Sequence, residues 1–144
     1  MKKSSNVFID TSAWLAILNP DDGSHEKARA YYAGLLERGA RLFTNNIVLD
    51  ETLDRLKREM GNKVAMEFMA IIDEGVLSLS IRLDWISRRV RRSAIEYLLS
   101  SRNDDLTLNH FYILETLRRK RIDIVFSFDR ALRAFDFPIM PQGE

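Results

Sequence analysis

Phe8-Ile9-Asp10-Thr11-Ser12 is the stretch that decides the fold, because an apolar run ends there in a carboxylate and turns polar. In open α/β folds, ligands bind outside the carboxyl ends of the strands. An Asp that ends a first, central strand therefore lies where such a fold would hold a metal ion. Thr11 and Ser12 follow directly, and their hydroxyls either contact a nucleic-acid ligand or only cap the next helix.

Strand-like and helix-like segments alternate along the rest of the chain. We predict strands at residues 7–10, 41–44, 76–81 and 124–128. Helices are predicted at residues 12–18, 24–38, 46–61, 62–75, 83–101 and 108–121, with Gly75 ending the fourth. This alternation is typical of βαβ units, so we expect an α/β fold with a mainly parallel sheet covered on both faces.

Length and composition indicate one ordinary globular domain spanning residues 1–144. The chain is 46% hydrophobic and 30% charged, and a chain of 144 residues buries roughly two-thirds of its unfolded surface. It has no cysteine, which excludes disulfides and thiolate metal sites and fits a reducing compartment. The apolar run near the N-terminus is too short for a signal peptide or a membrane span. We expect a soluble, cytoplasmic protein without a membrane partner.

Arginines gather in the second half of the chain, although the net charge is only +1. Runs occur at residues 88–92 and 118–121, and Arg130 and Arg133 follow. Guanidinium groups bind phosphate in a forked geometry, so these runs are candidate RNA contacts, with Arg130 beside the closing acidic residue. The simpler interpretation is a solvated helix face, and the two are compatible.

Three carboxylates are predicted to meet at one edge of the sheet. Asp10 and Asp129 each end a strand, and Glu51 lies about one turn into the helix after the second strand. Clustered carboxylates repel one another unless a cation neutralises them. Ligation by oxygen alone suits Mg²⁺ or Mn²⁺, and such an ion supports hydrolysis of a phosphodiester. Alternatively, Asp10 and Asp129 only cap helices and Glu51 is a solvated carboxylate.

Four stretches resemble the PIN domain family, in particular its VapC-type toxin ribonucleases. They are Phe-Ile-Asp-Thr-Ser-Ala at 8–13, His25 with Ala28 and Ala30, Leu-Phe-Thr-Asn-Asn-Ile-Val-Leu-Asp-Glu-Thr-Leu at 42–53, and Phe-Ser-Phe-Asp-Arg-Ala-Leu at 126–132 followed by Phe-Pro-Ile-Met-Pro at 137–141. They occur in the family's order and span residues 7–141, nearly the whole chain.

The resemblance implies a three-layer α/β/α fold with a five-stranded parallel sheet, and cleavage of RNA with Mg²⁺ or Mn²⁺. Asp10, Glu51 and Asp129 would be both the catalytic acids and metal ligands. It also implies a homodimer and a cognate antitoxin that blocks the acidic site, as expected of the toxin in a type II toxin–antitoxin pair. RNA processing is the open alternative to a toxin role.

One position departs from the family pattern. His110 stands where the family usually has a further Asp. Asp105, five residues upstream, could supply the missing charge as a metal ligand. Otherwise His110 binds a softer ion or takes part in catalysis, or it is a polar helix-start residue and activity is impaired. The last case predicts a catalytically impaired PIN-like module that binds RNA or a protein.

Overall fold

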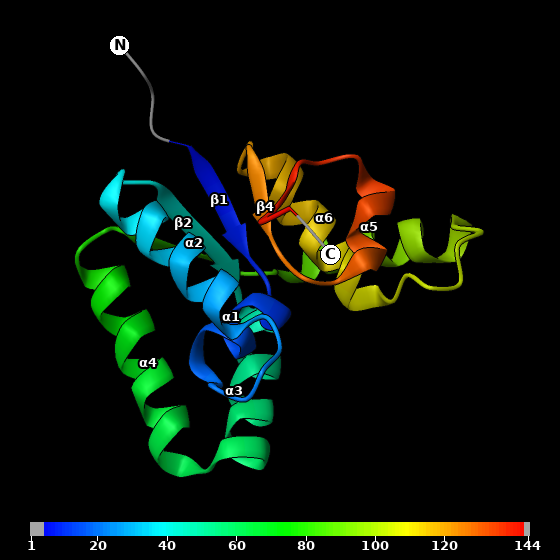
Figure 1. Cartoon of the computed structure of the whole chain (residues 1–144). Helices are drawn as coiled ribbons and strands as arrows, with labels where there is room; N and C mark the ends of the chain where they lie inside the picture. The colour runs from blue at the N-terminus through cyan, green and yellow to red at the C-terminus, as the bar shows by residue number, and fades with distance from the viewer. Residues whose placement is uncertain (1–4, 143–144) are drawn as a thin grey trace.

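The computed structural model describes residues 5–142. One sheet of five parallel strands has the order β3-β2-β1-β4-β5 (Figure 1). The strands are β1 (Asn6–Ile9), β2 (Arg41–Asn45), β3 (Ile81–Asp84), β4 (Ile124–Phe126) and β5 (Ile139–Met140). The predicted five-stranded parallel sheet is therefore confirmed, with β1 at its centre.

Helices cover both faces of the sheet. They are α1 (Thr11–Leu18), α2 (His25–Glu37), α3 (Asn46–Met60), α4 (Asn62–Leu77), α5 (Arg88–Ser100), α6 (Leu108–Arg119) and the 3₁₀ helix η1 (Arg130–Phe135). Figure 1 shows α1 to α4 on one side of the sheet and α5 with α6 on the other, which confirms the three-layer architecture. No helix in the described part of the chain is long and apolar enough to span a bilayer.

The apolar run that opens the chain forms the centre of the core. Val7, Phe8 and Ile9 are fully buried, because strands of a parallel sheet covered on both faces have no solvent side. Neighbouring β1 and β4 run in register, with Ile9 opposite Phe126. The next residues along both strands therefore leave the sheet at the same edge, and Asp10 and Asp129 both lie there.

The third strand differs from its prediction. β3 spans Ile81–Asp84 rather than residues 76–81, and α4 continues through Gly75 to Leu77. The apolar residues after Gly75 resemble a strand in sequence, but Leu77 is exposed. The chain turns instead at Leu79, which has φ 64°. α5 consequently begins at Arg88 rather than residue 83.

Gly75 serves close packing rather than helix termination. A Cβ added there would lie 2.4 Å from Cδ1 of Ile81, so only glycine lets α4 approach the start of β3. We expect Gly75→Ala to lower the free energy of unfolding by about 1–3 kcal/mol, the usual cost of overpacking. Urea denaturation measures this change.

Gly34 provides the matched control, since it lies inside α2 with nothing within 4 Å of an added Cβ. Gly34→Ala should stabilise the protein by roughly 0.5–1 kcal/mol through helix propensity. Equal effects of the two substitutions would contradict the packing role of Gly75.

Candidate active site at the carboxyl ends of the strands

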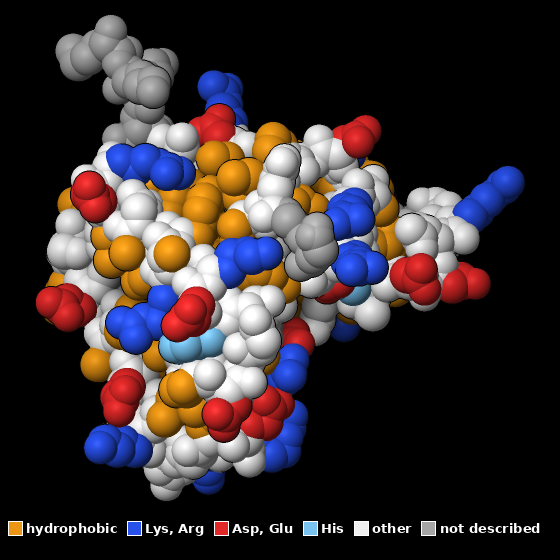
Figure 2. All heavy atoms as spheres, in the orientation of Figure 1, with side chains coloured by type: hydrophobic (Ala, Val, Ile, Leu, Met, Phe, Trp, Pro, Cys, Tyr) orange, Lys and Arg blue, Asp and Glu red, His pale blue; other side chains and the backbone are white. Residues whose placement is uncertain are grey.

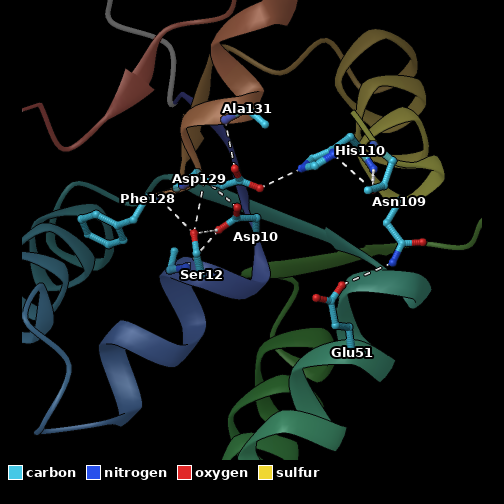
Figure 3. Close-up of polar contacts among 11 residues, drawn as sticks. Asp10, Ser12, Glu51, Asn109, His110, Phe128, Asp129 and Ala131 are labelled. Atoms are coloured by element: carbon cyan, nitrogen blue, oxygen red, sulfur yellow. Dashed lines mark hydrogen bonds and ion pairs between the residues drawn. The ribbon is translucent and has the colours of Figure 1, made fainter. Parts of the chain in front are cut away.

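Asp10 is a buried carboxylate held by three hydrogen bonds (Figure 3). Its Oδ1 accepts from the backbone N–H of Ala13 at 2.9 Å and from Oγ of Ser12 at 2.7 Å. Its Oδ2 accepts from Oγ of Ser127 at 2.5 Å. The bond to Ala13 shows that Asp10 caps α1, which is compatible with a further role as a metal ligand, and Ser127 adds a link to the chain after β4.

Burial raises the pKa of Asp10 from 3.8 to about 6. The hydrogen bonds from Ser127, Ser12 and Ala13 act in the opposite direction, and the nearby charge of Asp129 raises the pKa further. Desolvation is thus the dominant cause, because the charged form loses its hydration inside the protein. Ionisation of the buried Asp10 therefore destabilises the folded protein unless a cation lies beside the carboxylate. A bound metal ion would supply that positive charge.

Asp129 lies next to Asp10 and caps η1. Its Oδ1 accepts from the backbone N–H of Ala131 at 3.0 Å, and its own backbone N–H donates to Oγ of Ser127 at 2.9 Å. Ser127 therefore connects Asp10 to Asp129 through one hydroxyl. Ser127 is not among the site residues predicted from the sequence, although its position two residues before an acid that follows a strand is a usable signal.

Ser12 contributes a second bridge between the two strand ends. Its Oγ donates to Asp10 and accepts from the backbone N–H of Phe128 at 2.9 Å. The side chain is half-buried. Ser12 thus orients the carboxylate of Asp10. The sequence had suggested only a contact to nucleic acid or a helix cap for this residue.

His110 contacts the second carboxylate directly. Its Nε2 lies 2.8 Å from Oδ2 of Asp129. Its Nδ1 accepts from the backbone N–H of Thr107 at 2.9 Å, which completes a capping box at the start of α6. Because Nδ1 accepts, this hydrogen-bond pattern assigns the ring proton to Nε2, which donates to Asp129. Both ring nitrogens are engaged, and neither has a lone pair free for a metal.

Glu51 lies across from these two carboxylates. It is exposed on α3, and its Oε1 accepts from Nδ2 of Asn109 at 3.4 Å. Figure 3 shows Glu51 facing Asp10 and Asp129 from the other side of the site. Within residues 5–142, no group of three or more His, Cys, Asp or Glu side chains lies close enough to hold a metal. The structure brings Asp10 and Asp129 together and leaves Glu51 tied to α6.

The donor set nevertheless fits Mg²⁺ or Mn²⁺. Asp10 and Asp129 offer carboxylate oxygens at one sheet edge, and the buried charge of Asp10 has no cationic partner among its hydrogen bonds. Mg²⁺ keeps several waters and is bound through one or two carboxylates plus substrate phosphate. A pair of carboxylates with a third acid opposite therefore suits such an ion.

Two other predicted site residues lie elsewhere. Asp105 is exposed before α6, and among the described residues its side chain makes no hydrogen bond to Asp10, Glu51 or Asp129. Thr11 is buried between α1 and α3, where its Oγ1 accepts from Thr52 at 3.0 Å. This hydroxyl is engaged in helix packing, so we do not retain Thr11 as an RNA contact.

Arg130 lies beside the carboxylates on a concave surface. Asp129, Arg130 and Arg133 line a cavity of about 720 Å³. Figure 2 shows Lys and Arg side chains over η1, the orange-red segment at the right of Figure 1. Two arginines in the cavity that Asp129 lines match a ligand with several phosphates, because such a ligand is bound through positive charge.

This arrangement defines a class of protein. A parallel sheet with the order 3-2-1-4-5, carboxylates after β1 and β4, and a Glu on α3 is that of a PIN nuclease domain. The chain belongs to the PIN domain family, whose sequence model matches residues 7–138.

Particular relatives agree with this assignment. The 23S rRNA-specific endonuclease VapC20 of Mycobacterium tuberculosis, in strains CDC 1551 and H37Rv, is 28% identical over 131 residues, covering 91% of this chain and 95% of the relative. The crystal structure of that species' VapC20, a sarcin–ricin loop cleaving toxin, superposes with a TM-score of 0.79 at 26% identity and covers 91% of this chain and 95% of its own. The predicted resemblance to VapC-type ribonucleases is confirmed.

A more distant structure supports the fold alone. FitAcB from Neisseria gonorrhoeae has a TM-score of 0.63 at 17% identity and covers 94% of this chain and 96% of its own. The same three-layer architecture therefore persists where few residues are shared.

Proposed function

We propose that this protein is a divalent-metal-dependent endoribonuclease and the toxin of a type II toxin–antitoxin pair. The observation that carries the proposal is the buried carboxylate of Asp10, joined through Ser127 to Asp129 at the carboxyl edge of the sheet. Membership of the PIN family and the likeness to a curated endonuclease support the same reaction class.

The residues of the site have two kinds of role, binding the metal ion and orienting the carboxylates that bind it. Asp10 and Asp129 would hold Mg²⁺ or Mn²⁺, and Glu51 faces them from α3. A bound ion of this kind lowers the pKa of water and stabilises charge that develops on a phosphate. Ser12 and Ser127 fix the carboxylate of Asp10, while His110 fixes that of Asp129. Asp105 as a further metal ligand remains a prediction.

RNA binding follows from the cations beside the acids. Arg130 and Arg133 line the same cavity as Asp129, so their guanidinium groups can hold phosphates on either side of the scissile bond. Ser12 is half-buried next to Asp10 and can approach a ribose or phosphate. A hairpin loop of 23S rRNA is the first substrate to test, since the named relative acts on 23S rRNA.

Assembly and location are part of the proposal. Homodimer formation, a cognate antitoxin and a cytoplasmic location are expected from the VapC-type resemblance.

A second candidate is a PIN-like module that binds RNA or a protein partner without cutting. One observation favours it: a neutral His110 replaces the usual acid and occupies one oxygen of Asp129. This reduces the negative charge available to a metal ion.

Cleavage of a labelled 23S rRNA hairpin tests the two candidates. Reactions with Mg²⁺, Mn²⁺ or EDTA are compared, with a single-stranded RNA pool beside them. We expect metal-dependent cutting that EDTA abolishes. RNA binding without cutting in either metal, by a protein with intact circular dichroism, would favour the non-catalytic module.

A further inference from the structure

A second concave site is separate from the carboxylates and strongly basic. This basic pocket has a volume of about 430 Å³ and lies between β2, β3 and the C-terminal end of α6. Its ionisable lining residues are one acid, Asp84, and five cations, Arg41, Arg82, Arg119, Lys120 and Arg121. Its lining reaches the start of β1, about 13 Å along that strand from Asp10 at 3.3 Å per residue.

The single acid of the basic pocket is already neutralised. Asp84 is buried, and its two oxygens accept from Nη1 and Nη2 of Arg119 at 3.1 and 2.6 Å. Oδ2 also accepts from Oγ1 of Thr116 at 2.6 Å. Because this forked ion pair occupies both oxygens, Asp84 compensates Arg119 and leaves the charges of Arg82, Lys120 and Arg121 unbalanced.

Three of the remaining cations have no acidic partner among the described residues. Arg82, Lys120 and Arg121 are all exposed, and none forms an ion pair. The guanidinium of Arg82 lies 6.0 Å from the ring centroid of Phe43, an aromatic contact that orients it without reducing its charge. A concave surface lined by one sign of charge concentrates the field and attracts counter-ions.

Asn6 holds the basic pocket together. Its Nδ2 donates to the carbonyls of Lys120 and Arg121 at 3.3 and 3.2 Å, and its Oδ1 accepts from Nε of Arg41 at 2.6 Å. One side chain thus ties the end of α6 to the start of β2. These bonds hold the guanidinium of Arg41 and the backbone that carries Lys120 and Arg121.

We propose that the basic pocket binds a backbone phosphate of the RNA substrate, as a second contact distinct from the cleavage site. The inference rests on the proposed function, and it specifies a folded RNA that presents phosphates at two places on the protein. Guanidinium forks and an ammonium group match phosphate oxygens. Each such contact releases counter-ions, so RNA affinity should depend on salt through these residues.

The test compares two double variants in RNA binding. Arg82→Ala with Arg121→Ala removes two cations from the basic pocket. Arg29→Ala with Lys63→Ala is the matched control, since both side chains are exposed and lie in α2 and α4, outside the pocket. Fluorescence anisotropy with a labelled 23S rRNA hairpin is measured in EDTA, where nothing is cut, over a range of KCl concentrations.

We expect the pocket variant to weaken binding about tenfold or more and to reduce the slope of log K against log salt by roughly 0.7–0.9 per lost contact. The control should change the slope by less than half as much. Equal slopes for the two variants, or no RNA binding by the unmodified protein, would overturn the proposal.

A second measurement distinguishes binding of RNA in the basic pocket from binding of free inorganic phosphate. If calorimetry shows that inorganic phosphate binds the unmodified protein but not the pocket variant, while RNA affinity is unchanged, the pocket takes a free phosphate and the proposal fails. Binding in EDTA is independent of catalysis. A protein that never cuts can therefore still support this inference, and one that cuts can still contradict it.

Discussion

Asp10→Asn is expected to abolish metal-dependent RNA cleavage and, at neutral pH, to make the metal-free protein more stable. Cleavage should fall by more than about 100-fold, because even outer partners of metal ligands are worth 10- to 100-fold. The stability gain arises because burial raises the pKa of Asp10 to about 6. An Asn keeps a similar shape and an oxygen that can accept the bonds made at Oδ1, it loses the bond that Oδ2 accepts from Ser127, and it never ionises.

The raised pKa of Asp10 makes the free energy of unfolding decrease as the pH rises. The folded protein retains the Asp10 proton up to about pH 6, whereas the unfolded chain loses it near 3.8. The stabilisation that the protonated Asp10 side chain contributes is therefore fully present below pH 3.8 and is lost as the pH rises through about 6. The shift of about two pKa units corresponds to up to about 3 kcal/mol, so Asp10→Asn should gain up to that amount at pH 8 and little near pH 4.

Urea denaturation in EDTA at the two pH values measures the gain. Glu51→Gln is the control, since Glu51 is exposed; this variant should reduce cleavage without stabilising the protein at pH 8. Retained cleavage by Asp10→Asn, with unchanged circular dichroism, would remove Asp10 from the catalytic site.

His110→Ala should weaken Mn²⁺ binding by roughly 10- to 100-fold, the range for residues that orient metal ligands. His110 fixes Oδ2 of Asp129 at 2.8 Å, and without the imidazole that carboxylate loses its orientation toward Asp10. Calorimetry with Mn²⁺ at constant pH gives the affinity, and urea denaturation shows whether loss of the α6 capping box alone accounts for the change.

Asp105→Asn is the matched comparison, because Asp105 lies on the same approach to α6 but is exposed, and within residues 5–142 it belongs to no group of three acids or histidines that could hold a metal. We expect it to leave Mn²⁺ affinity within about twofold, well below the change expected for an orienting residue. The reverse order of effects would make Asp105 the residue that replaces the family's missing acid, and His110 a helix-start residue only.

Much of the fold is predictable from local pattern. The apolar run at Val7 to Ile9 predicted the first strand correctly, because a fully buried parallel strand needs continuous apolar residues. The error at β3 has an equally clear cause. Val76 and Leu77 are apolar but lie at the exposed end of α4, so their residue type alone does not distinguish the last turn of a helix from a strand.

The fold class, the order of the elements and the positions of the two acids that follow β1 and β4 can be predicted from the residues alone, since these depend on hydrophobic periodicity and residue type along the chain. Only the tertiary structure decided that Ser127 joins those acids, that His110 donates to Asp129, and that Asn6 assembles the basic pocket. These contacts join residues far apart in the chain, and hydrogen bonds depend on distances and directions that only the packed sheet and helices establish.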